Sequence, residues 1–553
     1  MERRTSLILL SVLGAGVFLS GLELMVTAVA LPSILANLSD WTQLRQASWI
    51  INGYLAVYVI TMPLAGRLSD LWGTRRLFLL ALLAFTIGSL LAGRAQTLDE
   101  LIAARLIQAL GGGTLVPVAT AAAAHLFEGN ARPKALGVIG GLTFLGMAAG
   151  PFVGSAILDS VHAGTALANH GITSGPLYDA LAASWRWVFY VNVPIGIVAL
   201  AIGWAASSGW ETPRHTGRVD FVGALLFSVA VGALLIGLTL MDGNLTARFL
   251  DPTYPPVQLF IVAVVSGALA VVFGLRRRDP FLDVRLFRSG SFSSAALVSL
   301  LTGYGFATAI VGGAVFVDRV LYGGADQQRV ALGALAGATA IGALGSGFAV
   351  RVLSLRWVTL LGLLLSGVAL WRMSTWSPSV RIGEVGLWMA LFGLGFGLTV
   401  TPRSTAAVEA VGREHFGMAS ATVTVARMIG MAVALAILVA YGSTTIDRLR
   451  AQIYATPDSY KQFLPPNLRD RPLKDGLVVQ ALEMWASQQA GQVLVGLFLV
   501  AGVLTVVAIP PSLALRRRRA TGEIGVETGV TDRRVLTAGG RDGTDDSEPT
   551  FAL

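Results

Sequence analysis

Ionisable side chains lie inside long apolar stretches of this chain, where a charge is energetically costly. Glu23 falls in the first stretch, in "GLELMVTAVALP", Arg105 falls in "RLIQALGGG", and Arg427 falls in "VARMIGM". A charge at the centre of a bilayer costs about 2.5–3.5 kcal/mol on insertion scales, so such residues mark functional sites by default. Burial favours the neutral form of a carboxyl, whereas a nearby cation favours the ionised form. A site that opens alternately to water could therefore load and release a proton at Glu23.

The composition requires a membrane around most of the chain. Of its 553 residues, 54% are hydrophobic and 13% are charged, whereas a soluble domain is about 45–50% apolar and about 25% charged. The net charge of +9 comes from positive residues in short loops and tails, which indicates contact with the membrane surface and no nucleic-acid partner. No cysteine is present, so disulfides and thiolate metal sites are excluded.

Fourteen apolar windows of the sequence are long enough to cross about 30 Å of hydrocarbon as helices. The fold class is therefore an all-α polytopic membrane protein. Arginine-rich segments such as "RLSDLWGTRR" and "ETPRHTGR" follow even-numbered windows, which predicts a multi-pass protein of the cell membrane with both termini cytoplasmic. The windows are 7–31, 47–66, 75–94, 100–127, 134–158, 184–206, 219–241, 256–274, 291–317, 330–350, 357–374, 383–408, 417–442 and 489–514.

The first six and the last six windows are related in organisation. A charged loop follows the second window of each outer set of six, "GRLSDLWGTRR" in one and "VRVLSLRW" in the other, and repeats of this kind place a substrate path between two bundles at mid-membrane. The prediction is a six-helix bundle in 1–206, a two-helix linker in 207–288, a second six-helix bundle in 289–515, and a disordered cytoplasmic tail in 516–553.

The segment 443–488, before the last window, is predicted to form an extracytoplasmic extension of the second bundle. Its flanks have helical periodicity, and prolines break its middle. The two flanking helices are expected to extend outward as an amphipathic stalk that guides a lipophilic substrate or binds a partner. A plain surface cap is the alternative.

Two short motifs join or interrupt the windows of the first bundle. In "GRLSDLWGTRR", glycines permit a tight turn and the acid can pair with arginine or accept from a helix start; a plain positively charged loop is the alternative. In "GGLTFLGMAAGPFVG", small residues recur at helical spacing before a proline, which favours close helix packing as much as function. The motif residues are Gly66, Asp70, Gly73, Arg75 and Arg76 in the first, and Gly146, Gly150, Pro151 and Gly154 in the second.

From about residue 7 to 515 the sequence resembles the major facilitator superfamily, specifically its fourteen-helix drug:proton antiporter branch. "GRLSDLWGTRR" resembles the loop motif of the superfamily, "RLIQALGGG" its fourth-helix motif, and "GMAAGPFVG" the exporter motif of its fifth helix. "WRWVFYVNVPIG" and "LELMVTAVALP" are similar to motifs of the fourteen-helix branch. The resemblance implies two six-helix bundles plus two linker helices, and it implies that Asp70, Arg75 and Arg76 stabilise an outward-facing form.

Within this branch the sequence is most similar to the mycobacterial exporters of triacylglycerides and drugs. "GLGFGLTVTPRSTAAVEAV", "ASATVTVARMIGM" and the enlarged segment before the last helix carry this likeness. It implies that Arg427 lies in the central cavity opposite the acid of the first helix. Glu23 stands where the branch usually has Asp, and Phe144 stands where the mycobacterial exporters carry an acid.

The resemblance makes Arg427 the expected counter-charge of Glu23, since an unpaired buried arginine is costly. In one interpretation Glu23 is the proton carrier; in the other, the Glu23–Arg427 pair only holds helices together. Arg105 is expected to face a cavity or a partner, with snorkelling toward the surface as the alternative. Arg403 and Glu409 form a candidate gate in the cytoplasmic half, again with snorkelling as the alternative.

The sequence contains no pattern that indicates enzyme chemistry. There is no G-x-x-x-x-G-K-[ST] loop, no H-E-x-x-H and no credible nucleophile triad. His125 and Glu128 have the spacing of metal ligands but no third ligand nearby. We therefore predict no enzyme activity, no cofactor and no metal.

Together these observations predict a monomeric, proton-coupled secondary exporter of lipophilic or cationic compounds that works by alternating access. The expected partners are protons, membrane lipids and a lipophilic substrate. One alternative is a lipid exporter that works with an extracytoplasmic carrier. An alternative of another class is a membrane receptor or scaffold without transport, which predicts no proton linkage at Glu23.

Overall fold

The structure is a computed structural model that describes residues 3–38, 49–206, 210, 220–240, 251, 253–277, 280, 283–453 and 458–516. Residues 1–517 form one compact unit. The secondary structure of the described residues is entirely helical. The tail predicted from residue 516 lies outside the described residues, apart from Arg516 itself.

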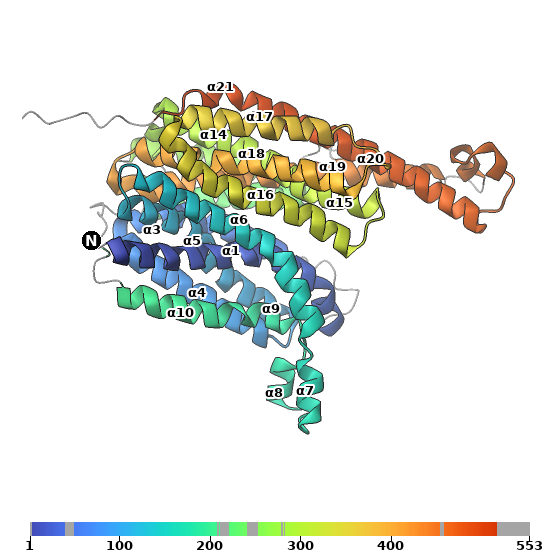
Figure 1. Cartoon of the computed structure of the whole chain (residues 1–553), viewed down its shortest axis with the longest axis horizontal. Helices are drawn as coiled ribbons and strands as arrows, with labels where there is room; N and C mark the ends of the chain where they lie inside the picture. The colour runs from blue at the N-terminus through green and yellow to red at the C-terminus, as the bar shows by residue number, and fades with distance from the viewer. Residues whose placement is uncertain are drawn as a thin grey trace, which may run out of the picture. The chain divides into compact units, whose positions relative to one another are not determined.

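Fourteen helices among the described residues are long and apolar enough to span a membrane. Each coincides with one of the windows found in the sequence, which confirms the polytopic all-α fold. The first described helix begins and the last ends at the same end of the bundle (Figure 1), here called the terminal end; the opposite one is the far end.

The first bundle contains six spanning helices and three short ones. The short helices α7 and α8 follow α6 at the far end, and α9 leads into the last spanning helix (Figure 1). The bounds are α1 (Arg3–Leu38), α3 (Trp49–Trp72), α4 (Thr74–Arg94), α5 (Leu98–Leu126), α6 (Ala131–Ser160), α7 (Ala163–Asn169), α8 (Pro176–Leu181), α9 (Arg186–Tyr190) and α10 (Asn192–Ala205).

The second bundle repeats this organisation, and its first span is interrupted by a π-helical turn. That turn, η4 (Thr308–Gly312), joins α14 (Gly290–Ala307) to α15 (Gly313–Arg319). The other elements are η3 (Val284–Arg288), α16 (Ala325–Val352), α17 (Leu355–Met373), α18 (Ile382–Glu409), η5 (Arg413–His415), α19 (Phe416–Ile453), η6 (Ser459–Phe463), η7 (Pro466–Leu468), α20 (Gly476–Val507) and α21 (Ile509–Ser512).

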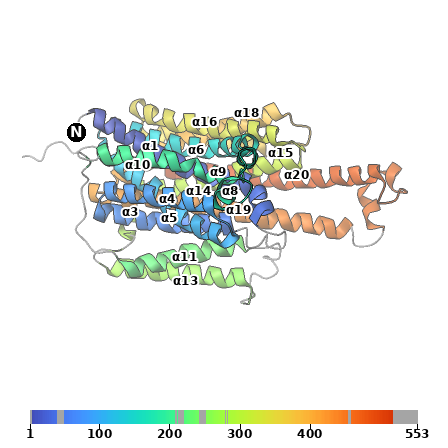
Figure 2. The same ribbon diagram turned by 90° about the horizontal axis from the view of Figure 1, so that it is seen from below.

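Two further helices, α11 (Phe221–Thr239) and α13 (Pro255–Arg276), form a pair beside the two bundles (Figure 2). Helix α11 contacts α3 and α19, whereas α13 packs mainly against α11. Side chains such as Val264 of α13 remain exposed, as expected for a surface that meets lipid.

Local sequence sets where the helices of the first bundle begin. Gly73 adopts a φ of 89° between α3 and α4, a conformation that favours glycine because it has no Cβ. The Thr97 side chain accepts from the backbone N–H of Glu100 at 3.2 Å, and the Glu100 carboxylate accepts from the N–H of Gln96 at 2.8 Å. This capping arrangement fixes the start of α5 and thereby the register of Arg105.

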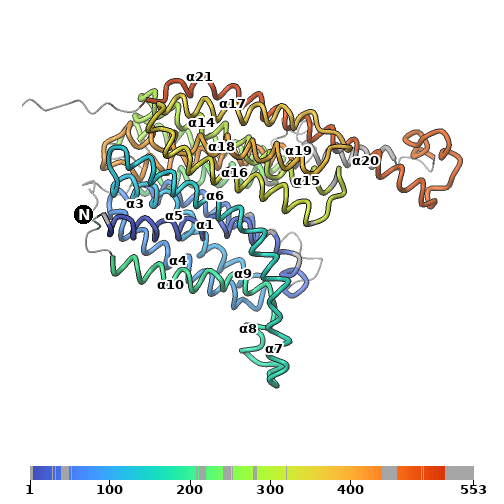
Figure 3. Tube along the Cα trace, viewed as in Figure 1, coloured from blue at the N-terminus to red at the C-terminus, as the bar shows by residue number. Residues whose placement is uncertain are grey.

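The two bundles meet along α6 with α16 and along α3 with α19 (Figure 3). Small residues allow this approach. A methyl group added to Gly347 would lie 2.8 Å from the carbonyl oxygen of Pro133, and one added to Gly66 would lie 2.6 Å from that of Gly417.

Helices α19 and α20 continue past the other helices at the far end (Figures 1 and 2). Between them, a small apolar cluster that includes Tyr460, Leu464 and Val478 is buried, and the rings of Phe463 and Trp485 lie 4.4 Å apart. We call residues 443–488 the stalk, of which 454–457 lie outside the described residues. The continuation of both helices agrees with the sequence interpretation.

Candidate functional site

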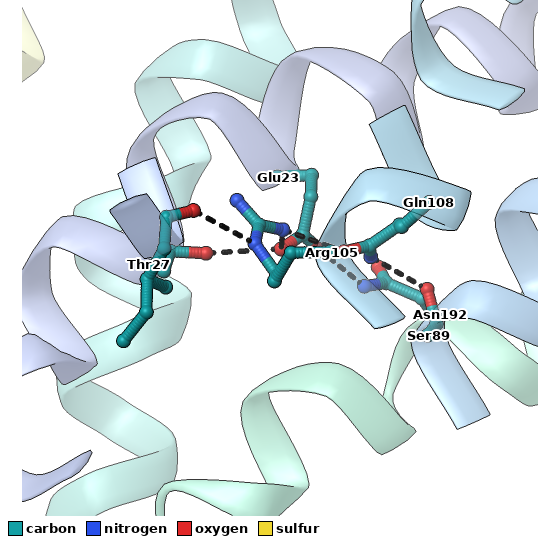
Figure 4. A network of polar contacts seen from close by, with 7 residues as sticks. Glu23, Thr27, Ser89, Arg105, Gln108 and Asn192 are labelled. Carbon is teal, nitrogen blue, oxygen red and sulfur yellow. Dashed lines mark hydrogen bonds and ion pairs between the residues drawn. The ribbon is translucent and has the colours of Figure 1, made fainter. Parts of the chain in front are cut away.

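Glu23 is completely buried on α1 at the centre of a polar network (Figure 4). Arg105 of α5 forms an ion pair and hydrogen bond with its Oε1. Thr27 donates to the same oxygen at 3.0 Å, and Asn192 of α10 donates from Nδ2 to Oε2 at 2.7 Å. The carboxylate therefore accepts bonds from three helices.

Arg105 keeps partners that do not depend on Glu23. Its Nη1 donates to Oε1 of Gln108 at 2.5 Å, and its Nε donates to the carbonyl oxygen of Ile50 at 3.4 Å. Its Cζ lies 3.9 Å from the ring centroid of Tyr54, a cation–π contact. Gln108 is held in turn, since its Nε2 donates to Ser89 of α4 at 2.7 Å. Neutral groups thus continue to hold the guanidinium if the carboxylate gains a proton.

The expected pairing of Glu23 with Arg427 is wrong in this structure, because the guanidinium that meets Glu23 belongs to Arg105. Arg427 instead lies over Phe144, with its Cζ 5.2 Å from the ring centroid. Residue type alone indicated that a cation would be needed, but the rotation of each helix decides which of several arginines faces the acid. The alternative of a snorkelling Arg105 is also wrong, since Arg105 is 1% exposed.

The exporter-motif glycines pack α6 against α1 beside this network. A Cβ on Gly150 would lie 2.8 Å from Cβ of Met25, and one on Gly154 would lie 3.1 Å from Cγ2 of Val26. A Cβ on Gly146 would collide with the Phe18 carbonyl, and Pro151 lies inside the same helix. The motif therefore sets how closely α6 approaches the helix that carries Glu23.

The loop-motif acid Asp70 connects the two bundles at the terminal end. Its Oδ1 accepts from the backbone N–H of Gly417 at 2.7 Å, and its Oδ2 accepts from that of Met418 at 2.9 Å. These N–H groups belong to the first turn of α19, where a helix has unpaired donors and a partial positive charge. Arg75 is partly buried and Arg76 is exposed at the start of α4.

Further contacts close the terminal end between the bundles. Ser420 donates to the carbonyl oxygen of Pro117 at 2.8 Å. Glu409 lies 4.0 Å from Arg132 of α6, and Arg413 pairs with Glu128. The hydrogen bond and charge of Arg413 hold the pKa of Glu128 below its ordinary value.

Arg403 does not snorkel, because it is only 2% exposed. Its Nε donates to the carbonyl oxygen of Thr399 at 2.8 Å, and its Nη1 donates to the hydroxyl of Thr302 on α14. It therefore does not pair with Glu409, and the two residues named as a gate lie in different surroundings.

Sequence reasoning missed Gln108, Asn192, Thr27 and Ser89 as members of the network. Two of them carried a usable signal: Gln108 follows Arg105 by three residues, so both lie on one helix face, and Asn192 is the polar residue of "WRWVFYVNVPIG". No group of three or more His, Cys, Asp or Glu that could hold a metal is found among the described residues.

Glu23 and Arg105 thus form an acid–arginine pair buried among the spanning helices, with α11 and α13 beside the two bundles. The sequence matches the Major Facilitator Superfamily over residues 13–435. The chain belongs to this family. It is an integral multi-pass membrane protein.

Curated relatives place the chain among transporters. It is 31% identical over 474 residues to a triacylglyceride transporter of Mycolicibacterium hassiacum, an alignment that covers 83% of this chain and 84% of the relative. It is 27% identical to Multidrug resistance protein 3 of Bacillus subtilis, with 76% of this chain and 77% of the relative covered.

Solved structures show the same fold. A bacterial homolog of the human lysosomal transporter Spinster, in an inward-facing and unoccupied conformation, superposes with a TM-score of 0.57 at 17% identity, over 93% of this chain and 99% of the other. The proton:xylose symporter XylE superposes with a TM-score of 0.55 at 12% identity, over 94% of this chain and 98% of the other.

Proposed function

We propose that this transporter exports lipophilic compounds in exchange for protons, and that Glu23 carries the proton. The buried Glu23–Arg105 pair is the observation that carries the proposal. In this scheme the terminal end faces the cytoplasm, and the protein works as a monomer in the cell membrane.

The surroundings of Glu23 fit a carboxyl that changes its protonation state. When it is ionised, Arg105, Thr27 and Asn192 all donate to it. When it is protonated, Arg105 loses its counter-ion but keeps Gln108, the Ile50 carbonyl and the Tyr54 ring. These neutral partners would keep the guanidinium hydrogen-bonded in both protonation states of Glu23.

The position of the pair fits proton entry from the far end. Glu23 lies about 30 Å along α1 from its start at the terminal end, at about 1.5 Å per residue. Arg105 lies about 10 Å along α5 from the start of that helix at the far end. The closed contacts at Asp70 and Ser420 lie at the opposite end, as an outward-facing form would require.

Export in this scheme follows from rocking of the two bundles around a central site. A lipophilic molecule enters from the cytoplasm or the inner leaflet while the terminal end is open. After the bundles rock, it leaves at the far end, and a proton binds Glu23. The proton is released to the cytoplasm when the terminal end opens again.

Transport measurements with defined dyes test this function. Cells expressing the full chain are loaded with Nile red, a neutral lipophile, or ethidium, a lipophilic cation, with and without a protonophore. We expect efflux of at least one dye by the wild type that falls to background with the protonophore and with Glu23→Gln. Glu384→Gln, which removes a half-exposed carboxylate paired with Arg372 within the second bundle, is the control and should retain efflux.

Either of two results would contradict the coupling. Efflux that persists with Glu23→Gln at matched expression would make the pair structural. Absence of any dye efflux, together with no proton movement in reconstituted vesicles, would favour a receptor or scaffold.

A lipid exporter is the second candidate function, and the stalk favours it. The relative from Mycolicibacterium hassiacum is named a triacylglyceride transporter, and the stalk of α19 and α20 could hold an extracytoplasmic lipid carrier at the far end. Transfer of a fluorescent triacylglyceride from reconstituted vesicles to acceptor vesicles separates this candidate from drug export. Loss of lipid transfer on deletion of 454–475, with dye efflux retained, would assign the stalk to lipid delivery.

A further inference from the structure

Two arginines of the second bundle lie without an acid beside them. Arg403 is buried and donates only to neutral oxygens, those of Thr399 and Thr302. Arg427 is partly buried, and its Nε is enclosed without a hydrogen-bond partner among the described residues. In the described part of the chain, no carboxylate lies within ion-pair distance of either guanidinium.

Helix α14 brings the two arginines to one place. Thr302 accepts from Arg403, and the next residue, Gly303, packs directly on the backbone of Arg427. A Cβ on Gly303 would lie 3.0 Å from the Cα of Arg427, so a larger residue would push α19 away. Consecutive residues of one helix therefore contact the guanidinium of Arg403 and the backbone of Arg427.

Three phenyl rings form a compact cluster between the arginines. Phe306 stacks on Phe396 with centroids 4.5 Å apart, and Phe144 lies edge-on to them at 5.4 and 5.2 Å. The Cζ of Arg403 lies 5.4 Å from the centroid of Phe396, and that of Arg427 lies 5.2 Å from the centroid of Phe144. Cation–π contacts stabilise a desolvated cation by less than the hydration that the buried ion gives up.

We infer that Arg403 and Arg427 bind the anionic headgroup of the transported molecule, a carboxylate or a phosphate, while its apolar body lies on Phe144, Phe306 and Phe396. This inference rests on the proposed transport function and names its substrate class: single-headed anionic amphiphiles. Guanidinium groups bind carboxylate and phosphate through paired N–H donors, and the phenyl rings supply apolar surface beside them.

The division of the cluster between the bundles explains how such a molecule enters. Phe144 belongs to α6 of the first bundle, whereas Phe306, Phe396 and both arginines belong to the second. Rocking that separates α6 from α18 opens the cluster and leaves both cations on one wall. The bound headgroup then replaces the aromatic contact that Phe144 makes with Arg427.

The same charges disfavour a cationic cargo, which the sequence had suggested. A cation at this cluster would meet two guanidinium groups, and like charges brought together in a poorly solvated site repel strongly. The carboxylate of Glu23 does not offset them, because Arg105, Thr27 and Asn192 already occupy its oxygens.

Equilibrium binding to the purified full chain in a non-ionic detergent tests this assignment. The probes share one apolar body and differ in the head: oleate, oleoyl lysophosphatidic acid, oleyl alcohol and oleylamine. Acetate and inorganic phosphate serve as heads without a body. We expect the two anionic amphiphiles to bind at least 10-fold more tightly than the alcohol and the amine. The free anions should bind at least 100-fold more weakly than the anionic amphiphiles.

Charge variants separate recognition from folding. Arg427→Gln and Arg403→Gln should each weaken oleate binding at least 10-fold, whereas Arg427→Lys, which keeps the charge but not the paired donors, should weaken it less than Arg427→Gln does. Phe144→Glu places a carboxylate beside Arg427, so it should abolish oleate binding; its midpoint of thermal unfolding is measured alongside, because the substitution also removes a buried phenyl ring. Arg372→Gln, which removes a half-exposed arginine paired with Glu384, is the matched control and should bind like the wild type.

Equal affinity for oleate, oleyl alcohol and oleylamine would overturn the inference, as would oleate binding that ignores Arg427→Gln and Phe144→Glu. The assay needs no proton gradient, so its failure is distinct from failure of the proposed function. Gradient-driven dye efflux together with binding that ignores the charge of the head would support proton-coupled export and contradict the anion site. Charge-selective binding without gradient-driven efflux would support the anion site and contradict proton-coupled export.

Discussion

Asp70 of α3 accepts a hydrogen bond of 2.7 Å from the backbone N–H of Gly417, so a carboxylate of the first bundle caps a helix of the second. Its other oxygen accepts from the next N–H, that of Met418. A helix start within one bundle usually finds its cap in its own chain neighbourhood. Here the cap exists only while the bundles are together at the terminal end.

Loss of this cap should open the terminal end more often. Loss of a capping side chain costs about 0.5–2 kcal/mol, so Asp70→Ala should raise the open population about 2- to 30-fold. The chain contains no cysteine, and Ser420 is buried at this contact. A Ser420→Cys reporter should therefore react with a maleimide faster by that factor when Asp70 is replaced. Asp70→Asn, which keeps one acceptor oxygen, should lie between, and an unchanged rate would contradict a closing role.

The approach of α3 and α19 should tolerate no methyl group at Gly66. A Cβ there would lie 2.6 Å from Cβ of Ala421 and from the carbonyl oxygen of Gly417. Overpacking of this kind costs about 1–3 kcal/mol, so Gly66→Ala should lower the midpoint of thermal unfolding in detergent. Gly345→Ala on α16 is the control, because nothing lies within 4 Å of its added Cβ; it should be neutral or slightly stabilising. Equal effects of the two substitutions would mean that the contact relaxes freely.

Removing the two members of the Glu23–Arg105 pair should have unequal effects on stability. Breaking a buried pair usually costs about 3–5 kcal/mol because an uncompensated charge remains. Arg105→Gln should approach that effect at a pH where Glu23 stays ionised, since it leaves the buried carboxylate without its cation. Glu23→Gln should have a smaller effect, because Gln108 and Tyr54 still hold the guanidinium.

The double variant Glu23→Gln/Arg105→Gln completes a double-mutant cycle. It should recover most of the stability lost in Arg105→Gln. Chemical unfolding of all four proteins in one detergent measures the coupling. Equal losses for the two single variants would show that the neutral partners of Arg105 do not support the protonated state.

The Glu128–Arg413 pair should contribute a small, pH-dependent stabilisation at the terminal end. The hydrogen bond to Arg413 lowers the pKa of Glu128 below its ordinary 4.5, so the stabilisation is present above that value and is lost as the pH falls through the lowered pKa. Both side chains are about half exposed or more, which limits the contribution to about 0–1 kcal/mol. The difference in unfolding midpoint between wild type and Glu128→Gln should be small at pH 7 and should shrink as the pH falls below 4.5. A difference that grows on acidification would have the wrong sign for this pair.

The sequence predicted the spanning helices well because length and apolarity are local properties. It also identified Glu23 and Arg105, since an ionisable residue in an apolar span needs no structure to be noticed, and it identified Asp70 from the charged loop motif. It could not assign Arg105 to Glu23, because the two lie 82 residues apart and the facing side chains depend on helix rotation. The sequence also could not predict the contact between Phe144 and Arg427, because helix packing alone places the arginine over this ring.

The short helices α7 and α8 show another limit of the sequence. Residues 159–184 are rich in polar residues and glycine, a composition typical of a loop. In the structure the segment contains α7 and α8, and contacts connect it to α9. One of them is the hydrogen bond from Tyr190 to the carbonyl oxygen of Ala180 at 3.0 Å. Helices of this length gain their stability from such neighbours rather than from their own residues.

The helix pair α11 and α13 has a consequence for topology. Each crossing of a bilayer reverses the side on which the chain emerges, so the orientation of the second bundle depends on whether the number of preceding crossings is even or odd. A single inserted helix would turn that bundle upside down and separate Asp70 from the start of α19. Two inserted helices restore the parity, and because α13 packs mainly on α11, they do so without entering the core. The pair is thus the smallest addition between the bundles that leaves the second one the same way up.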